Sequence, residues 1–216
     1  MKKLFKAIHD KDLETVRALL EADPALIACV AKQPPKKDDG QSPLQVALKS
    51  GALRIAEELL DRGADVNFME DPACCNAWRA PALHDAINAA VMCSRWNTNG
   101  PDGLKVFSTQ KRADKAYEIL ARMIRLGADV NAPDSYGNSP LWRFCMQAAQ
   151  ILPAYDRAAQ ALKSDRLLTP ELQGDLARIF LLLKDSGADL DYVAPNTGKS
   201  PRDFYARGPL ADLLAL

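Results

Sequence analysis

The sequence predicts an all-α solenoid, in which helix-turn-helix units stack side by side and hairpin-like finger loops connect them. The main observation is a short phrase that occurs three times, as Gly-Ala-Asp-Val-Asn at 63–67 and 127–131 and as Gly-Ala-Asp-Leu-Asp at 187–191. An amphipathic run rich in aliphatic residues precedes each copy. The second observation is a Ser-Pro pair, at 42–43, 139–140 and 200–201, in front of further helical patterns. Self-similarity of this kind indicates stacked units rather than one globular core.

Each element of the unit follows from local chemistry. Gly63, Gly127 and Gly187 are expected just after the second helix of a unit, because glycine enters the left-handed region without a steric penalty. The Asp and Asn that follow can bond their own backbone in a tight turn. Ser before Pro is expected to cap the first helix, with Pro at its first position. The predicted order is cap, helix, turn, helix, glycine stop and finger.

The repeats can be placed along the chain, which we expect to form a single domain over residues 1–216. Residues 1–36 keep the apolar spacing of a helix pair but lack the opening phrase, which predicts an N-terminal capping repeat. Residues 37–76 form the most regular unit. Residues 77–135 and 136–196 contain the next two units, each with an insertion of roughly 25 residues between its helices. Residues 197–216 are expected to be the C-terminal cap.

The two insertions differ in composition. The stretch 96–103 is polar and contains glycine, which predicts an exposed loop before helical character resumes near Lys111. The second insertion stays helical in composition from Leu141 to Leu168, with a kink at Pro153 and a restart at Thr169-Pro170. Lengthened helices that project beyond the solenoid are therefore expected in the fourth repeat.

These motifs resemble the ankyrin repeat family, whose pattern opens Thr-Pro-Leu-His-x-Ala and closes Leu-Leu-x-x-Gly-Ala-Asp-Val-Asn over about 33 residues. The matching segments are Ser42-Pro43-Leu44, Leu83-His84-Asp85-Ala86 and the run from Leu59-Leu60 to Asn67. The resemblance implies a concave face, built from first helices and fingers, that binds partners. The partner-binding residues that it implies are Lys49, Phe68, Met69, Trp78, Arg79, Asp85, Asn88, Tyr136, Trp142 and Arg143.

Two of these tryptophans have a second interpretation. Trp78 is an interface type of residue, but it can equally hold its long finger in place. Trp142 stands in the position that the family gives to His, where it either packs between neighbouring fingers or contacts the partner. His84 occupies the family's own His position, which implies a hydrogen bond that orders the turn rather than a catalytic base.

Composition gives no sign of a nucleic-acid or membrane partner. Lys plus Arg and Asp plus Glu both number 28, and no apolar run approaches a membrane span. The basic stretch from Lys105 to Arg125 is interpreted as a solvated helix face, with nucleic-acid binding as the alternative. No secretory signal is recognised, so we expect a cytoplasmic protein, or one secreted without a classical signal peptide.

The five cysteines are an odd number without a disulfide framework, which favours a reducing compartment. Zinc is not expected, because Cys74 and Cys75 are adjacent and only two histidines are present. Cys29 and Cys145 are expected to be buried apolar filler.

The sequence therefore predicts a monomeric, non-enzymatic module for protein–protein interaction, with no catalytic residue, cofactor or metal. Its specific role is open between an immunity or antitoxin-like inhibitor of one partner and a secreted effector that engages host proteins. An enzyme with its site in the insertions is a further alternative, although no phosphate loop, nucleophile elbow or paired-His helix is present.

Overall fold

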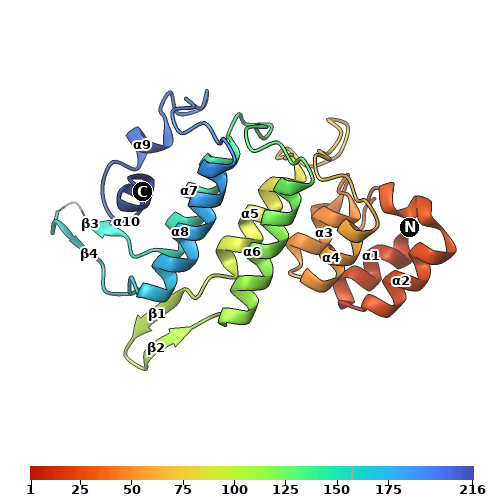
Figure 1. Ribbon diagram of the computed structural model, residues 1–216, viewed down its shortest axis with the longest axis horizontal. Coiled ribbons are helices and arrows are strands. Elements are labelled where there is room, and N and C mark those ends of the chain that lie inside the picture. The colour runs from red at the N-terminus through yellow and green to blue at the C-terminus, as the bar shows by residue number, and fades with distance from the viewer. Residues whose placement is uncertain (157) are drawn as a thin grey trace.

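The computed structural model describes residues 1–156 and 158–216, which form an elongated stack of helix pairs (Figure 1). The helices are α1 (Lys2–Asp10), α2 (Leu13–Ala22), α3 (Pro43–Lys49), α4 (Leu53–Asp61), α5 (Ala82–Met92), α6 (Gln110–Arg125), α7 (Pro140–Ile151), α8 (Pro170–Asp185), α9 (Pro201–Phe204) and α10 (Pro209–Leu214), with short 3-10 turns η1 (Pro24–Ala28) and η2 (Lys36–Asp38). Four short strands form two antiparallel hairpins, β1 (Asn97–Gly100) with β2 (Gly103–Val106), and β3 (Tyr155–Asp156) with β4 (Ala161–Leu162).

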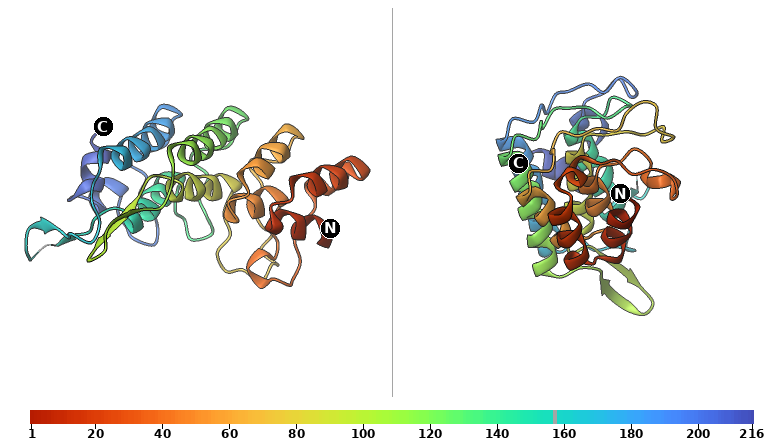
Figure 2. Two further views of the ribbon diagram at one scale, coloured as in Figure 1. Left: turned by 90° about the horizontal axis from the view of Figure 1, so that it is seen from below. Right: turned by 90° about the vertical axis from the view of Figure 1, so that its right-hand side faces the viewer.

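The helices are arranged in two rows. The first helices α1, α3, α5, α7 and α9 contact one another in that order, and the second helices α2, α4, α6, α8 and α10 do the same. The left view of Figure 2 shows the rows one above the other. Finger loops join each second helix to the next first helix and gather at one edge, whereas the β1–β2 hairpin lies at the opposite edge (Figure 1). The predicted helical solenoid is thus present, with small hairpins that an all-α description omits.

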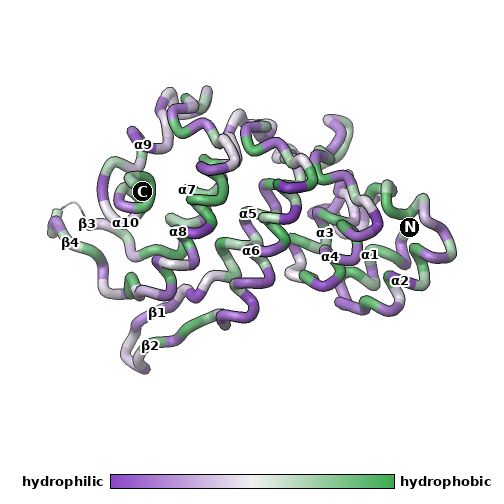
Figure 3. Tube along the Cα trace, in the orientation of Figure 1, coloured by the Kyte–Doolittle hydropathy of each residue, from purple (hydrophilic) through white to green (hydrophobic). Residues whose placement is uncertain are grey.

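The core lies between the two rows. Each helix carries hydrophobic and hydrophilic residues in alternation along its length (Figure 3), as expected for an element with one buried face. The largest fully buried side chains include Leu4, Leu44, Leu59, Leu83, Phe144 and Phe180. These residues come from the first four repeats, so one continuous hydrophobic core runs along the stack.

The predicted caps are present. Ser42, Ser139 and Ser200 are the N-caps of α3, α7 and α9, where each side chain accepts a hydrogen bond from a backbone N–H of the first turn. Ser42 forms a complete capping box with Gln45. Thr169 caps α8 in the same way, with Pro170 at the first position, as the sequence predicts.

The repeated glycine phrase connects neighbouring repeats. Gly127 has a φ of 91°, the left-handed conformation that the sequence predicts. The Asn67 side chain donates to the carbonyl of Gly127 and accepts from the N–H of Asp129, both at 2.9 Å. Asn131 makes the same pair of bonds to the following repeat, at 2.9 and 2.8 Å. The final asparagine of the phrase therefore links each repeat to the next, a role beyond the tight turn that the sequence predicts.

The sequence predicts that the stretch 96–103 of the first insertion is an exposed loop, but the structure differs. The insertion forms the β1–β2 hairpin, and Asn97 at its base is fully buried. The Asn97 side chain donates to the carbonyl of Leu167 at 2.9 Å and accepts from its N–H at 2.8 Å, and Asn99 bonds the backbone of 164–165. The two insertions thus hold each other.

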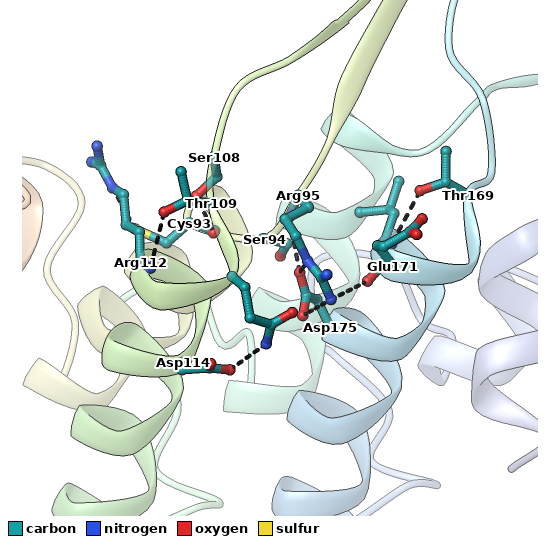
Figure 4. Close-up of polar contacts among 12 residues, drawn as sticks. Cys93, Ser94, Arg95, Ser108, Thr109, Arg112, Asp114, Thr169, Glu171 and Asp175 are labelled. Atoms are coloured by element: carbon teal, nitrogen blue, oxygen red, sulfur yellow. Dashed lines mark hydrogen bonds and ion pairs between the residues drawn. The ribbon is translucent and has the colours of Figure 1, made fainter.

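An ion pair fixes the base of the same hairpin. Arg95 donates from its backbone N–H and from its guanidinium to the buried carboxylate of Asp175 on α8, at 2.9 to 3.0 Å (Figure 4). The guanidinium also reaches the carbonyl of Glu171 at 3.3 Å. Buried bidentate pairs of this kind impose geometry, so the insertion of the third repeat has a defined position against the fourth.

The prediction of helix from Leu141 to Leu168 is wrong for its second half. Helix α7 ends at Ile151, and Leu152 has an extended backbone. The reason is Pro153, because a proline disfavours helical backbone at the residue before it. Beyond it the described chain forms the β3–β4 hairpin rather than a continued helix. The helices of this repeat are nonetheless long, with 12 residues in α7 and 16 in α8, compared with 7 in α3 and 9 in α4.

Candidate functional site

Five of the residues implied as partner-binding come together where the fingers meet the first helices of repeats two to four. Lys49 ends α3, Asp85 and Asn88 belong to α5, Arg143 belongs to α7, and Trp78 projects from the finger between the second and third repeats. Asp85 and Asn88 are three residues apart, so they share a helix face. We call this set, together with Asp134 described below, the concave cluster.

Trp78 is the centre of the cluster. Two cations lie against its ring, with the Arg143 guanidinium 4.6 Å and the Lys49 ammonium 5.8 Å from the ring centroid. The indole N–H donates to the Asp134 carboxylate at 2.9 Å. Trp78 therefore holds its finger to the next one, which is one of the two predicted roles, while its half-buried ring stays partly accessible.

Asp134 connects the cluster to the following finger. Its buried carboxylate accepts hydrogen bonds from Arg143 at 2.8 Å and from the backbone N–H groups of Tyr136 and Asn138, both at 2.9 Å. Burial alone would raise the pKa of Asp134, but the hydrogen bonds from Trp78, Asn138 and Tyr136 outweigh it and lower the pKa. The carboxylate is therefore ionised and structural.

Asp85 differs from Asp134, because its pKa is raised rather than lowered. It is 1% exposed, and neither carboxylate oxygen has a hydrogen-bond partner among the described residues. Burial raises its pKa to about 7 and the nearby Glu70 adds to the rise, although Lys49, Arg143 and the side chain of Gln45 lower it. Glu70 itself accepts hydrogen bonds from Gln41 and from the Ala80 backbone. Buried polar groups are normally paired, so Asp85 is an exception that needs a reason.

Two more polar groups of the cluster also lack partners in the described chain. They are the Asn88 Oδ1 and the Arg143 Nε, and both residues are half-buried. The cluster thus contains buried polar atoms without partners at Asp85, Asn88 and Arg143, next to a partly accessible aromatic ring. Such an arrangement can form hydrogen bonds and apolar contacts with an added molecule, but it contains no nucleophile beside a base.

The finger residues are on the surface to different extents. Tyr136 is 52% exposed, whereas Phe68, Met69 and Arg79 are half-buried. Arg79 exchanges backbone hydrogen bonds with Ser135 of the next finger, through its N–H to the Ser135 hydroxyl at 3.0 Å and its carbonyl to the Ser135 N–H at 2.8 Å. These fingers are consequently joined into one surface.

Two of the implied residues require correction. Trp142 is only 2% exposed, because it packs against Phe204 and Tyr205 of the C-terminal repeat, with ring centroids 5.3 and 6.0 Å away. It is a core residue between repeats and cannot reach a partner. Asp85 is also buried, so its carboxylate is not part of the surface that a partner contacts.

His84 behaves as the resemblance implies. Its Nε2 bonds the carbonyl of Ala132 at 2.9 Å, which orders the next finger. Burial lowers its pKa to about 4, so the ring is neutral and donates this hydrogen bond. A neutral, fully buried ring committed to the backbone is structural.

Asp134 and Glu70 are the functional residues that sequence reasoning missed. A signal for Asp134 was present, since Asp followed by Gly137-Asn138 is typical of a tight turn closed by the Asp side chain. Glu70 had no such signal, because its partners Gln41 and Ala80 are remote in the sequence.

Within residues 1–156 and 158–216, no group of three or more His, Cys, Asp or Glu side chains is placed to hold a metal ion, and no helix is long and apolar enough to cross a bilayer. All five cysteines are free; Cys145 is buried as predicted, but Cys29 is only half-buried.

Comparison with known proteins identifies the repeat. Residues 2–70 match the family described as ankyrin repeats (3 copies). No curated protein matches the chain. The matched segment contains α1 to α4, and the same pairing of helices, with a left-handed glycine after the second helix, continues through α5 to α8. Over residues 2–70 the chain is therefore similar to ankyrin repeats.

Proposed function

We propose that the protein binds another protein through the concave cluster and the adjoining fingers, without catalysing a reaction. Ankyrin repeats generally mediate protein–protein interaction, and stacked repeats present an extended concave surface for it. The observation that carries the proposal is the concave cluster, where a half-buried tryptophan with two cations against its ring adjoins unpartnered buried polar groups.

The roles within the cluster follow from its contacts. Trp78 and Arg143 are anchors, because Trp and Arg that are already held in place lose little conformational freedom on binding. Asn88 supplies an amide for hydrogen bonds with the partner. Lys49 is the exposed member of the cluster, at the end of α3. Tyr136 extends the surface along the fingertips.

The experiment needs a concave variant and a matched outer variant. Lys49→Glu with Asn88→Ala changes the cluster without removing a hydrogen bond that the structure contains. Arg125→Ala with Asp185→Ala is the control, on exposed positions in the last turns of the second helices α6 and α8. Glu58 is unsuitable as a control, because it binds Arg17 and Arg62 at 2.7 and 2.8 Å rather than facing solvent.

A partner is first captured from lysate and identified by mass spectrometry, and the purified partner is then titrated against both variants. The concave variant is expected to lose about 2 kcal/mol or more, roughly thirtyfold in affinity, and the outer variant a few tenths. Both variants must first show the melting transition of the parent. A loss of affinity in the outer variant alone would place the interface elsewhere.

The same proposal extends to the setting in which the protein acts. Five free cysteines support a reducing compartment such as the cytoplasm. We propose a monomer, and sedimentation of the purified protein tests this directly.

A further inference from the structure

A groove opens between α4 and α6, at the edge of the stack opposite the fingers. The groove forms because the two helices differ in length, with 16 residues in α6 and 9 in α4. At 1.5 Å per residue the difference is about 10 Å, so the first turns of α6 extend past the start of α4. Figure 1 shows this overhang beside the β1–β2 hairpin.

The other side of the α6 overhang is already covered. Arg178 of α8 pairs with Asp114 at 2.5 Å, and its guanidinium lies 4.9 Å from the ring centroid of Tyr117. Arg112, by contrast, points away from the Arg95–Asp175 pair (Figure 4) and reaches the turn at Gly51. The side that faces α4 is therefore the open one.

The groove has a volume of about 1100 Å³. Its floor is formed by apolar residues at the start of α4, namely Ala52, Leu53 and Ile55. A cavity of this size exceeds the usual range for small molecules, which is roughly 300 to 1000 Å³. It matches better the kind of groove into which an amphipathic segment of a protein lays its apolar face.

The rim of the groove is unbalanced in charge. Lys115 pairs with Glu57, and Asp114 pairs with Arg178 across the stack. Among the described residues, four exposed cations of the rim have no ion-pair partner, and the one rim carboxylate without an ion pair is Glu118; the four cations are Lys11, Arg54, Lys111 and Arg112. The uncompensated charge is thus positive, and it surrounds an apolar floor.

We propose that this groove is a second docking surface, separate from the concave cluster, for an acidic amphipathic segment of a protein. The floor accepts the apolar side chains of the segment, and Lys11, Arg54 and Lys111 pair with its carboxylates. A nucleic acid fits less well, because its backbone has no apolar side chains to place on the floor. The lining also contains no aromatic side chain on which a base could stack.

The test uses synthetic probes and charge reversal. The probe is a fluorescein-labelled peptide of about 14 residues, with Leu at i, i+3, i+4 and i+7 and Glu elsewhere, titrated by fluorescence anisotropy at about 0.15 M salt. Its counterpart carries Lys in place of Glu. The test variant is Arg54→Glu with Lys111→Glu, and the control is Arg125→Glu with Lys163→Glu, all at exposed positions.

The test variant is expected to fold, because Arg54 and Lys111 lie in the first turns of their helices, where acidic residues are favourable. The Glu peptide should bind the parent and the control, and should bind the test variant at least about tenfold more weakly, while the Lys peptide should not bind. Arg54→Ala with Lys111→Ala should give a smaller loss. Failure of the Glu peptide to bind, or equal binding to both reversal variants, would overturn the proposal.

Two further measurements separate this surface from its alternatives. The concave variant Lys49→Glu with Asn88→Ala should bind the Glu peptide as the parent does, because neither Lys49 nor Asn88 lines the groove. A labelled single-stranded oligonucleotide should not compete with the peptide. Competition would instead favour nucleic-acid binding and contradict the proposal.

Discussion

Replacing Asp85 with asparagine is expected to stabilise the folded protein at neutral pH, although the change is made in its interior. The carboxylate is 1% exposed and has no hydrogen-bond partner among the described residues. Its pKa rises from 3.8 to about 7 on folding. One pKa unit corresponds to about 1.4 kcal/mol, so ionisation of Asp85 in the folded state costs about 4 kcal/mol. Asparagine has a similar shape and never ionises.

The sign of the pH dependence follows from the direction of the shift. A carboxyl whose folded pKa is raised contributes its full stability below the unfolded pKa, near 3.8, and loses it as the pH rises through about 7. The free energy of unfolding of the parent should therefore fall relative to that of Asp85→Asn between pH 4 and 7. Above about pH 7 the difference should stay constant, at up to about 4 kcal/mol.

The assay is chemical denaturation of both proteins at several pH values, with Asp134→Asn as a control of opposite sign. The pKa of Asp134 is lowered, so its carboxylate stabilises the fold above the unfolded pKa and this contribution disappears as the pH falls. Asp134→Asn should be less stable than the parent at pH 7 and converge with it in acid. A pH-independent effect of Asp85→Asn, or a loss of stability at pH 7, would refute the reasoning.

Three other changes test the fold. Gly127→Ala should destabilise by about 1 to 3 kcal/mol, because φ is 91° there, whereas Gly174→Ala inside α8 should stabilise by up to about 1 kcal/mol; equal melting shifts would contradict the left-handed assignment. Asn97→Ala should cost about 1 to 3 kcal/mol by removing both hydrogen bonds to the second insertion, and an unchanged melting temperature would show that this contact is dispensable. In the native protein Cys75 should react with a thiol reagent before Cys145, because Cys75 is exposed and burial raises the pKa of the Cys145 thiol; mass spectrometry of the labelled peptides decides the order.

The repeated unit could be predicted from the sequence because each of its signals is local. Gly127 ends a helix and Ser139 begins one through the conformations and hydrogen bonds of their own neighbourhoods. The insertions could not be predicted in the same way. Asn97 is buried because it meets Leu167, which lies 70 residues along the chain, and no local pattern encodes that contact.

The sequence predicted which residues belong to the candidate site, but not which of them are buried or what charge they carry. Matching the repeat to its family placed Lys49, Asn88 and Arg143 on one surface, since the spacing of the repeat fixes which residues face the hollow. The burial of Trp142 depended instead on the packing of the C-terminal repeat against α7. The raised pKa of Asp85 depended on its burial and on the positions of Glu70, Lys49 and Arg143 around it, which only the folded chain brings together.

The contact between the two insertions gives the third and fourth repeats a second seam, at the edge opposite the fingers. In a linear stack, each repeat is coupled only to its neighbours, and local opening usually starts at the ends. Here the coupling is uneven, because the third and fourth repeats are joined twice. The hydrogen bonds of Asn131 join them at the finger edge, and those of Asn97 join them at the opposite edge. Amide hydrogens of α5 to α8 should therefore exchange together and slowly, as one cooperative unit, while those of α1 and α2 exchange first.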